Sequence, residues 1–228
     1  MITLTNSNVF NTDADAIVNT INCVGFMGKG LAFEYSLRYP DLLDEYKAKC
    51  KNNEIMVGKI YYYKTKEKLI VNFPTKNDYK YPSKIEWIKE GLLNFKETYK
   101  IYNIKSIALP LLGCSNGGLN YKIIIKLIFE YLSYLNINIY ICLDKNNPEG
   151  KELEMLNSFK TCDIDLLSEY VKLNSIQKNN LNRLKKNITR FYQISKIDGI
   201  GLETYKKIYS LFYNNKYESR KLEQQTLF

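Results

Sequence analysis

Residues 16–30 read AIVNTINCVGFMGKG, an apolar run followed by a polar segment with three glycines. β-branched side chains dominate the apolar run, which predicts a buried strand over Ala16–Ile21. The apolar spacing after the glycines predicts a helix over Gly30–Arg38. Glycines between a strand and a helix let the backbone approach a ligand closely, and the helix N-terminus presents N–H groups to an anion. The segment therefore predicts a strand–loop–helix unit with an anion site at its loop.

The same alternation of strands and helices continues to about residue 145, which indicates an α/β layer fold. Ser83 is expected to cap one of the helices, because Glu86 three residues later completes a capping box. The further strands are expected at Ile2–Thr5, Lys59–Tyr63, Leu69–Phe73, Ile107–Leu112 and Ile137–Leu143, and the further helices at Leu42–Lys51, Ser83–Tyr102 and Tyr121–Leu135.

After the turn residues Asn146–Gly150 the pattern is helical only, so residues 1–150 are expected to form one domain and residues 151–228 a second, helical region. The expected helices of this second region are Glu152–Phe159, Ile164–Leu173, Ile176–Tyr192 and Leu202–Phe212.

The positive charge is concentrated near the C-terminus. The net charge is +9, and residues 171–221 hold 12 of the 33 basic side chains but 3 of the 24 acidic ones. A local excess of this kind is what binding to a nucleic-acid backbone requires. A solvated basic helical face is the alternative.

The composition excludes several kinds of chemistry. The chain has no histidine, which removes Ser-His-Asp and Cys-His catalysis and histidine-containing zinc sites. The five cysteines are an odd number without a C-x-x-C pair, so neither a disulfide framework nor a metal cluster is expected, and no cofactor is expected. No signal peptide is recognisable, and charged residues interrupt the most apolar stretch, Tyr121–Leu143, so we expect a soluble, cytoplasmic protein without a membrane partner.

A second glycine-rich loop, Leu112–Gly118, also runs from a strand end to a helix start. Two such loops at the carboxyl edge of one sheet can clamp a diphosphate between them. Neither loop matches the P-loop or the dinucleotide-binding pattern. Two glycine turns without a ligand are the alternative.

A third segment, Val71–Pro82, carries Lys76 and Lys80 in a loop that follows a buried strand. A lysine at a strand end in a cleft can have a lowered pKa and act as a nucleophile or as an electrostatic stabiliser. An exposed loop lysine without such a role is the alternative.

Taken together, Asn19–Ala32, Asn72–Lys76 and Ala108–Leu119 resemble the macrodomain family, and more closely its DarG-like branch. The resemblance covers about residues 1–145. It implies a three-layer α/β/α macrodomain with a mixed central sheet, followed here by a small helical C-terminal region, and an ADP-ribose cleft at the strand ends.

DarG-like members remove the ADP-ribose that the DarT toxin attaches to thymine bases in single-stranded DNA. The resemblance therefore implies an ADP-ribosylglycohydrolase, with ADP-ribosylated single-stranded DNA as substrate and a DarT-like toxin as partner. A module that binds ADP-ribose or a related nucleotide signal without hydrolysing it is the alternative. A nucleic-acid-binding protein with the macrodomain as a mere scaffold is a third possibility.

The resemblance also assigns residues. Lys76 and Asn22 are expected to be catalytic, with Asn22 beside the distal ribose. Cys23 and Cys114 are expected to pack rather than to react, because no histidine can activate them. The residues expected to bind ADP-ribose are Asn8, Val9, Asn19, Gly25, Gly28, Lys29, Gly30, Thr75, Gly113, Cys114, Ser115, Asn116, Gly117, Gly118 and Leu119.

The sequence departs from the family in one place that matters. Macrodomains usually carry Gly-Asp-Ile near the end of the first strand, where the aspartate contacts the adenine amino group, whereas this chain has Ser7-Asn8-Val9. Asn8 is still expected to accept from that amino group through its side-chain carbonyl. The aromatic residue that follows the lysine in DarG-like loops, often a tryptophan, is matched by Tyr79.

The chemistry that the resemblance implies breaks a glycosidic bond through an oxocarbenium-like transition state, for which most glycosidases use two carboxylates. The three segments supply no such pair, since Asp78 is the only carboxylate of the lysine loop. Lys76 is therefore expected to act on the distal ribose, either as a covalent nucleophile at the anomeric carbon or by stabilising the departing thymine. Both roles stay open at this point.

The basic region contains a segment, residues 194–208, that resembles a helix–hairpin–helix. In that motif the glycines expose backbone N–H groups to a DNA phosphate. A helical hairpin that packs on the first domain is the alternative. The last five residues, Gln224–Phe228, resemble a peptide that binds the DNA sliding clamp, with a frayed tail as the alternative. The residues expected to contact DNA are Tyr79, Lys80, Lys196, Gly199, Gly201, Lys206 and Lys207.

Overall fold

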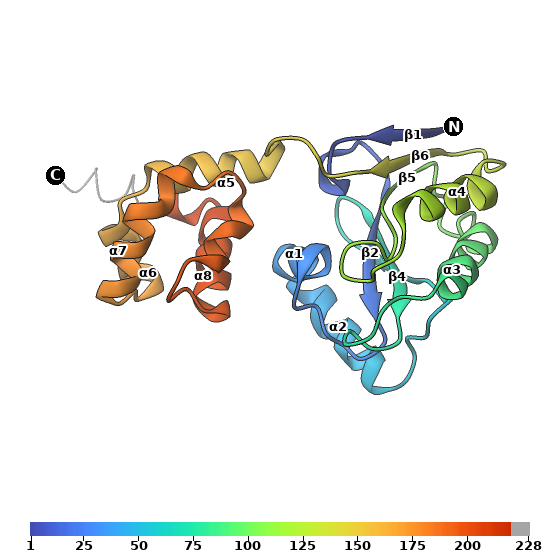
Figure 1. The fold of residues 1–228 in the computed structure, drawn as a ribbon, viewed down its shortest axis with the longest axis horizontal. Helices are drawn as coiled ribbons and strands as arrows, with labels where there is room; N and C mark the ends of the chain where they lie inside the picture. The colour runs from blue at the N-terminus through green and yellow to red at the C-terminus, as the bar shows by residue number, and fades with distance from the viewer. Residues whose placement is uncertain (220–228) are drawn as a thin grey trace. The chain divides into compact units, whose positions relative to one another are not determined.

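The computed structural model describes residues 1–219 (Figure 1). The chain divides into two compact units, Met1–Asn146 and Asn147–Phe228. The division falls four residues before the boundary expected at residue 150. We call the two units the α/β unit and the helical unit.

One six-stranded sheet forms the centre of the α/β unit, with the strand order β1-β6-β5-β2-β4-β3. β3 is antiparallel to β4, and every other neighbouring pair is parallel, which confirms the expected mixed sheet. The strands are β1 (Ile2–Thr5), β2 (Ala16–Asn22), β3 (Tyr61–Lys64), β4 (Leu69–Lys76), β5 (Ser106–Pro110) and β6 (Asn138–Cys142).

Helices cover both faces of this sheet and complete the predicted three layers (Figure 1). Successive side chains of a strand point to opposite faces, and β2 serves both cores in this way. Val18 packs in the core beneath α3 (Ile85–Thr98) and α4 (Tyr121–Leu132). Ile17 packs in the core beneath α1 (Gly30–Arg38) and α2 (Pro40–Lys51). The sheet is thus largely apolar on both faces, with Asn19 and Asn72 as a buried polar pair at its centre.

A β-bulge shapes the end of β4, which extends three residues beyond the predicted Phe73. Ile21 of β2 pairs with Pro74, but the next residue, Asn22, pairs with Lys76, so Thr75 is the extra residue. Pro74 is tolerated because β3 pairs with β4 only as far as Asn72, and the missing N–H lies beyond that ladder. The bulge places Lys76 beside Asn22 at the carboxyl edge of the sheet.

The predicted capping box at Ser83 is wrong. The helix α3 begins at Ile85 with Lys84 as its N-cap, and no side chain caps it. The N–H of Ser83 instead donates to the backbone oxygen of Gly117 at 3.0 Å, and its side chain is buried. A contact with a distant loop has displaced the local capping pattern.

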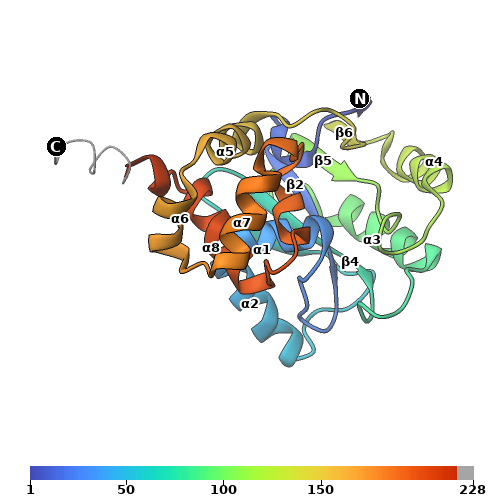
Figure 2. The same cartoon turned by 60° about the vertical axis from the view of Figure 1, so that its left-hand side comes forward.

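The helical unit is built from α5 (Gly150–Thr161), α6 (Ile164–Val171), α7 (Ser175–Leu184) and α8 (Leu202–Tyr213), which both views show as one cluster (Figures 1 and 2). The single helix predicted over Ile176–Tyr192 is wrong, because α7 ends at Leu184 and two 3₁₀ helices follow, η2 (Lys185–Asn187) and η3 (Phe191–Lys196). Because the helix ends there, the side chain of Phe191 packs in an aromatic core with Phe159 and Phe212. No helix among residues 1–219 is both long and apolar enough to cross a membrane.

A buried carboxylate holds this unit together. Glu152 of α5 is 8% exposed, and its Oε1 accepts from Nε of Arg190 at 2.9 Å and from the N–H of Phe191 at 3.0 Å. We expect Glu152→Ala to lower the free energy of unfolding of this unit by about 3 kcal/mol, because it removes the buried carboxylate that accepts from both Arg190 and the N–H of Phe191. Hydrogen–deuterium exchange of residues 147–219, measured at increasing urea concentrations, reports the change in this free energy.

The control for this prediction is Glu154→Ala on the same helix. Glu154 pairs with Lys151 at 3.2 Å, and its side chain is 67% exposed. We expect its removal to cost less than about 1 kcal/mol. Equal effects of the two substitutions would contradict the role given to Glu152.

Candidate active site

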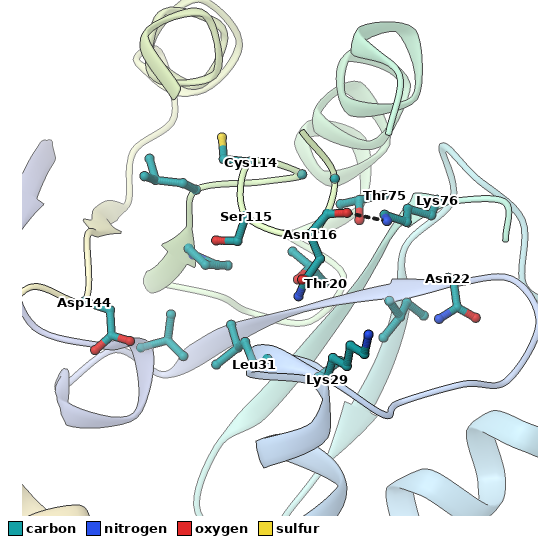
Figure 3. Close-up of a pocket in the computed structure, with 18 of the residues that line it drawn as sticks. Thr20, Asn22, Lys29, Leu31, Thr75, Lys76, Cys114, Ser115, Asn116 and Asp144 are labelled. Carbon is teal, nitrogen blue, oxygen red and sulfur yellow. Dashed lines mark hydrogen bonds between the residues drawn. The ribbon is translucent and has the colours of Figure 1, made fainter. Parts of the chain in front are cut away.

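A pocket of about 640 Å³ opens at the carboxyl edge of the sheet, lined by the ends of β2, β4, β5 and β6 (Figure 3). Parallel strands bring their carboxyl ends to one edge, so segments far apart in the sequence meet there. The predicted site residues that line the pocket are Asn8, Val9, Asn22, Gly28, Lys29, Gly30, Thr75, Lys76, Tyr79, Gly113, Cys114, Ser115, Asn116 and Gly117.

Four of the residues predicted to bind ADP-ribose lie outside this pocket. Asn19 is fully buried in the sheet, where its amide donates to Oδ1 of Asn72 at 2.9 Å. Gly25 faces α2 rather than the cavity, and Leu119 packs against the hydrophobic core. Gly118 is exposed next to the pocket-lining Gly117. The segments that contain these four residues line the pocket, but the four residues themselves do not.

Asn22 organises the first loop. Its Oδ1 accepts from the N–H of Val24 at 3.0 Å and of Phe26 at 3.3 Å, and its amide donates to the backbone oxygen of Phe26 at 2.6 Å. The hydroxyl of Tyr46 on α2 donates to the backbone oxygen of Asn22 at 2.7 Å and lies 3.0 Å from Oδ1 of the same residue. One amide hydrogen of Asn22 is left for a ligand. Asn22 therefore has two roles: it stabilises the first loop, and it lines the pocket.

Tyr46 is buried, and this burial raises its pKa well above the usual range, so its hydroxyl remains a neutral donor. Tyr46→Phe removes this donor from two buried acceptors of Asn22. We expect the free energy of unfolding to fall by about 1–2 kcal/mol, with faster amide exchange at residues 23–28. Chemical denaturation and hydrogen exchange measure the two effects. In the control Tyr61→Phe, whose hydroxyl bonds the exposed Glu45, exchange of this loop is expected to stay unchanged.

The two glycine loops meet across the pocket. Gly30 has a φ of +59°, and a Cβ there would lie 2.9 Å from Nδ2 of Asn116 in the second loop. Gly30 also begins α1, whose N-cap Lys29 makes no side-chain capping bond, so the first N–H groups of this helix face the cavity. Within residues 1–219, the N–H groups of Ser115, Asn116 and Gly117 donate to no protein acceptor. The arrangement is a cradle of N–H donors for an anion.

Lys76 extends its side chain from β4 toward the second loop (Figure 3). Its Nζ donates to the backbone oxygen of Asn116 at 2.5 Å and to that of Tyr79 at 3.3 Å. Burial lowers the pKa of Lys76 below that of a free lysine, because loss of water penalises the charged form. The two carbonyl contacts fix the ammonium and leave one of its three N–H donors for a ligand.

The thiols near the pocket are not prepared for nucleophilic attack. Burial raises the pKa of Cys23 and of Cys114 to about 11, so both are protonated at neutral pH. All five cysteines are free, and residues 1–219 contain no cluster of three or more potential metal ligands. Among the described residues that line the pocket, Asp144 is the one carboxylate, and it lies at the end opposite Lys76 (Figure 3). The pocket thus lacks the carboxylate pair of most glycosidases.

An aromatic pair forms the rim at the lysine end. The rings of Phe26 and Tyr79 lie 4.4 Å apart, and the two side chains are 45% and 43% exposed. Lys80, which does not line the pocket, places its Nζ 5.8 Å from the ring of Tyr79. Exposed aromatic rings next to lysines are surfaces on which unpaired nucleobases stack.

Several pocket residues were missed by the sequence reasoning. Most are at or just after strand ends, so the predicted order of strands was the signal that could have found them. They are Thr20, Ile21, Phe26, Leu31, Ala32, Pro110, Leu111, Cys142, Leu143 and Asp144.

The segment predicted as a helix–hairpin–helix has only one α-helix, α8, because the preceding element is the 3₁₀ helix η3. Gly199 has a φ of +81°, and its backbone oxygen accepts from Gln177 of α7 at 2.8 Å. Gly201 is the N-cap of α8. Of the predicted DNA contacts, Lys196 and Lys207 are exposed, whereas Lys206 pairs with Glu203 at 2.7 Å. DNA binding by this segment stays a prediction, and the clamp-like peptide lies outside the described residues.

A parallel sheet edge, two facing glycine loops and an uncapped helix N-terminus define an α/β/α domain whose pocket presents N–H donors suited to an anion. The chain matches the family model of the Macro domain over residues 18–128. It is also 36% identical to the solved macrodomain of Mycobacterium tuberculosis DarG, with a TM-score of 0.61, covering 62% of this chain and 97% of that one. The chain belongs to the macrodomain family.

Further proteins are similar to this chain. A Mycobacterium tuberculosis protein named DNA ADP-ribosyl glycohydrolase is 40% identical over 126 residues, 54% of this chain and 36% of that protein. The solved Thermosipho africanus DarTG in complex with ADP-ribose is 35% identical with a TM-score of 0.59, covering 64% of this chain and 43% of that one. A Thermosipho africanus protein named a fusion of a DNA ADP-ribosyl transferase and a DNA ADP-ribosyl glycohydrolase is 34% identical over 169 residues. The matches span less than half the length of these curated relatives.

Proposed function

We propose that this protein is an ADP-ribosylglycohydrolase that removes ADP-ribose from thymine bases in DNA. The observation that carries the proposal is the position of Lys76. Its ammonium is fixed between two backbone carbonyl groups at one end of an anion-binding pocket, with a lowered pKa and a free donor. The relatives named DNA ADP-ribosyl glycohydrolase support the same reaction.

The pocket accommodates the parts of ADP-ribose in order. The N–H groups of the second loop and of the start of α1 receive the diphosphate, where backbone donors and the helix dipole favour negative charge. The distal ribose then lies between Asn22 and Lys76, whose backbones pair in the sheet. The adenosine occupies the end opposite Lys76. The reacting bond is thus brought to the lysine.

The proposed reaction breaks the bond between the anomeric carbon of the distal ribose and a nitrogen of thymine. The free N–H of the Lys76 ammonium protonates the departing base, which takes the electron pair of the bond. Water then adds to the oxocarbenium carbon, and its surplus proton passes to the neutral Lys76 amine. A single lysine thereby supplies the acid and the base that glycosidases usually divide between two carboxylates.

The aromatic rim supports DNA as the other part of the substrate. Phe26 and Tyr79 stand next to Lys76, where the thymine leaves the ribose. Their rings stack on the modified base or on its neighbour, and Lys80 faces the phosphate backbone. We further propose that the chain counteracts a DarT-like transferase, since a relative carries both activities in one polypeptide.

The test uses a single-stranded oligonucleotide that bears ADP-ribose on one thymine. We expect the full chain to release free ADP-ribose and the unmodified oligonucleotide, both identified by mass spectrometry. An oligonucleotide that stays intact, combined with measurable ADP-ribose binding, would overturn the hydrolase and leave a binding module. Absence of both turnover and binding would overturn ADP-ribose as the ligand.

A further inference from the structure

The end of the pocket opposite Lys76 carries a carboxylate whose position is well defined (Figure 3). Asp144 follows β6, and its backbone has a φ of +49°, a left-handed conformation that aspartate and asparagine adopt more readily than most residues. Its N–H donates to the backbone oxygen of Ser7 at 3.3 Å, and the N–H of Lys145 donates to that of Asn6 at 2.7 Å. These bonds hold Asp144 beside the segment Ser7-Asn8-Val9.

Asn8 cannot play the part that the sequence suggested for it. Its Oδ1 is the N-cap acceptor of the 3₁₀ helix η1 (Val9–Asn11) and receives the N–H groups of Phe10 at 2.9 Å and of Asn11 at 3.1 Å. Both lone pairs of that oxygen are thereby used. The side chain of Asn8 has only its NH₂ group left to offer, and this donor does not complement the amino group of adenine, which is also a donor.

We propose that Asp144 reads the base of the bound nucleotide, by accepting a hydrogen bond from the exocyclic amino group of the adenine. This inference rests on the proposed binding of ADP-ribose. The carboxylate is acceptor-only and has more than one acceptor site, so it complements an amino group and opposes a keto oxygen at the same ring position. The apolar side chains of Val9 and Leu143, which flank Asn8 and Asp144 in the sequence, line the pocket beside the ring. The carboxylate for adenine therefore comes from the segment that follows β6.

The discrimination against a keto group is expected to be large. A hydrogen bond to a charged acceptor is worth more than one between neutral groups, and a carboxylate that faces a keto oxygen adds repulsion. We expect the protein to bind ADP-ribose at least about tenfold more tightly than inosine diphosphate ribose, which carries oxygen in place of the amino group.

The test is calorimetric titration of the full chain with these two nucleotides. In Asp144→Asn the amide can turn either its oxygen or its NH₂ group to the base, so the two affinities are expected to agree within about threefold. Asparagine also tolerates the left-handed backbone. Asp144→Ala is expected to weaken ADP-ribose and to bind the inosine analogue no worse than the natural chain does. Circular dichroism confirms that each variant is folded.

A matched control separates Asp144 from carboxylates outside the pocket. Asp13→Asn removes an exposed carboxylate that does not line this pocket, and is expected to change neither affinity. A preference for ADP-ribose that survives in both Asp144→Asn and Asp144→Ala would overturn the inference, as would equal binding of the two nucleotides by the natural chain. If neither nucleotide binds, the proposed function is overturned together with it.

Discussion

Lys76→Ala is expected to lower the rate of ADP-ribose removal from DNA by at least about 10³-fold, the range that general acid–base groups supply. The substitution removes a proton donor with a lowered pKa. Among the described residues, no other group at that end of the pocket combines these two properties. ADP-ribose affinity is expected to change by less than about tenfold, because the diphosphate is held by backbone N–H groups of the loops. Transition-state stabilisation is lost while ground-state binding is largely kept.

The measurement is single-turnover cleavage of the modified oligonucleotide, with ADP-ribose binding determined in parallel. Lys89→Ala is the matched control, since Lys89 is an exposed lysine on α3 that does not line the pocket. It should cleave at the rate of the natural chain. Cleavage by Lys76→Ala within tenfold of that rate would remove the lysine from the mechanism.

The pH dependence distinguishes the two chemical roles of Lys76. As a proton donor, the lysine must be charged when the base departs, so the rate is expected to fall as the pH rises through its pKa. Burial places that pKa below the value of a free lysine, so the fall begins at lower pH than an exposed lysine would show. A covalent nucleophile requires the neutral amine, and the rate would then rise over the same interval. Reduction of the reaction mixture with borohydride would also trap a lysine adduct in that case.

Local sequence patterns were sufficient to predict much of the fold and which segments of the chain line the pocket. The apolar runs around Val18 and Ile139 predicted strands, and parallel strands must end at one edge of the sheet. Three loops that follow three of those strands were therefore bound to meet. Lys76, Asn22 and the second glycine loop line one pocket for this topological reason.

The local patterns failed where a residue has two possible partners. Ser83 has the sequence of a helix cap, but its N–H bonds Gly117, which lies 34 residues further along the chain. Asn8 stands at the position of an adenine contact, but its oxygen caps η1, and Asp144 comes to the pocket from the other end of the unit. The 3₁₀ segments after Leu184 depend on the burial of Phe191. Such choices depend on contacts between distant residues, which periodicity does not reveal.

Gly117→Ala is expected to weaken ADP-ribose binding by at least about hundredfold, the second largest effect that the structure predicts. A Cβ at Gly117 would lie 2.2 Å from the backbone oxygen of Gly113 and 2.3 Å from Oγ of Ser83. The loop can relieve this overlap only by moving the N–H groups that face the diphosphate. Calorimetric titration with ADP-ribose, together with a thermal unfolding curve that shows an intact fold, measures the loss.

The neighbouring glycine provides the comparison that isolates the cause. A Cβ at Gly118 meets no atom within 4 Å, but its φ of +76° disfavours an L side chain. Gly118→Ala therefore carries backbone strain of about 1–2 kcal/mol without a clash, and its effect on binding should be the smaller of the two. The double variant Ser83→Ala/Gly117→Ala removes the hydroxyl but keeps the oxygen of Gly113, which is backbone and cannot rotate away. It should bind as poorly as Gly117→Ala alone, and recovery of binding would mean that Ser83, rather than the loop backbone, sets the limit on side-chain size at this position.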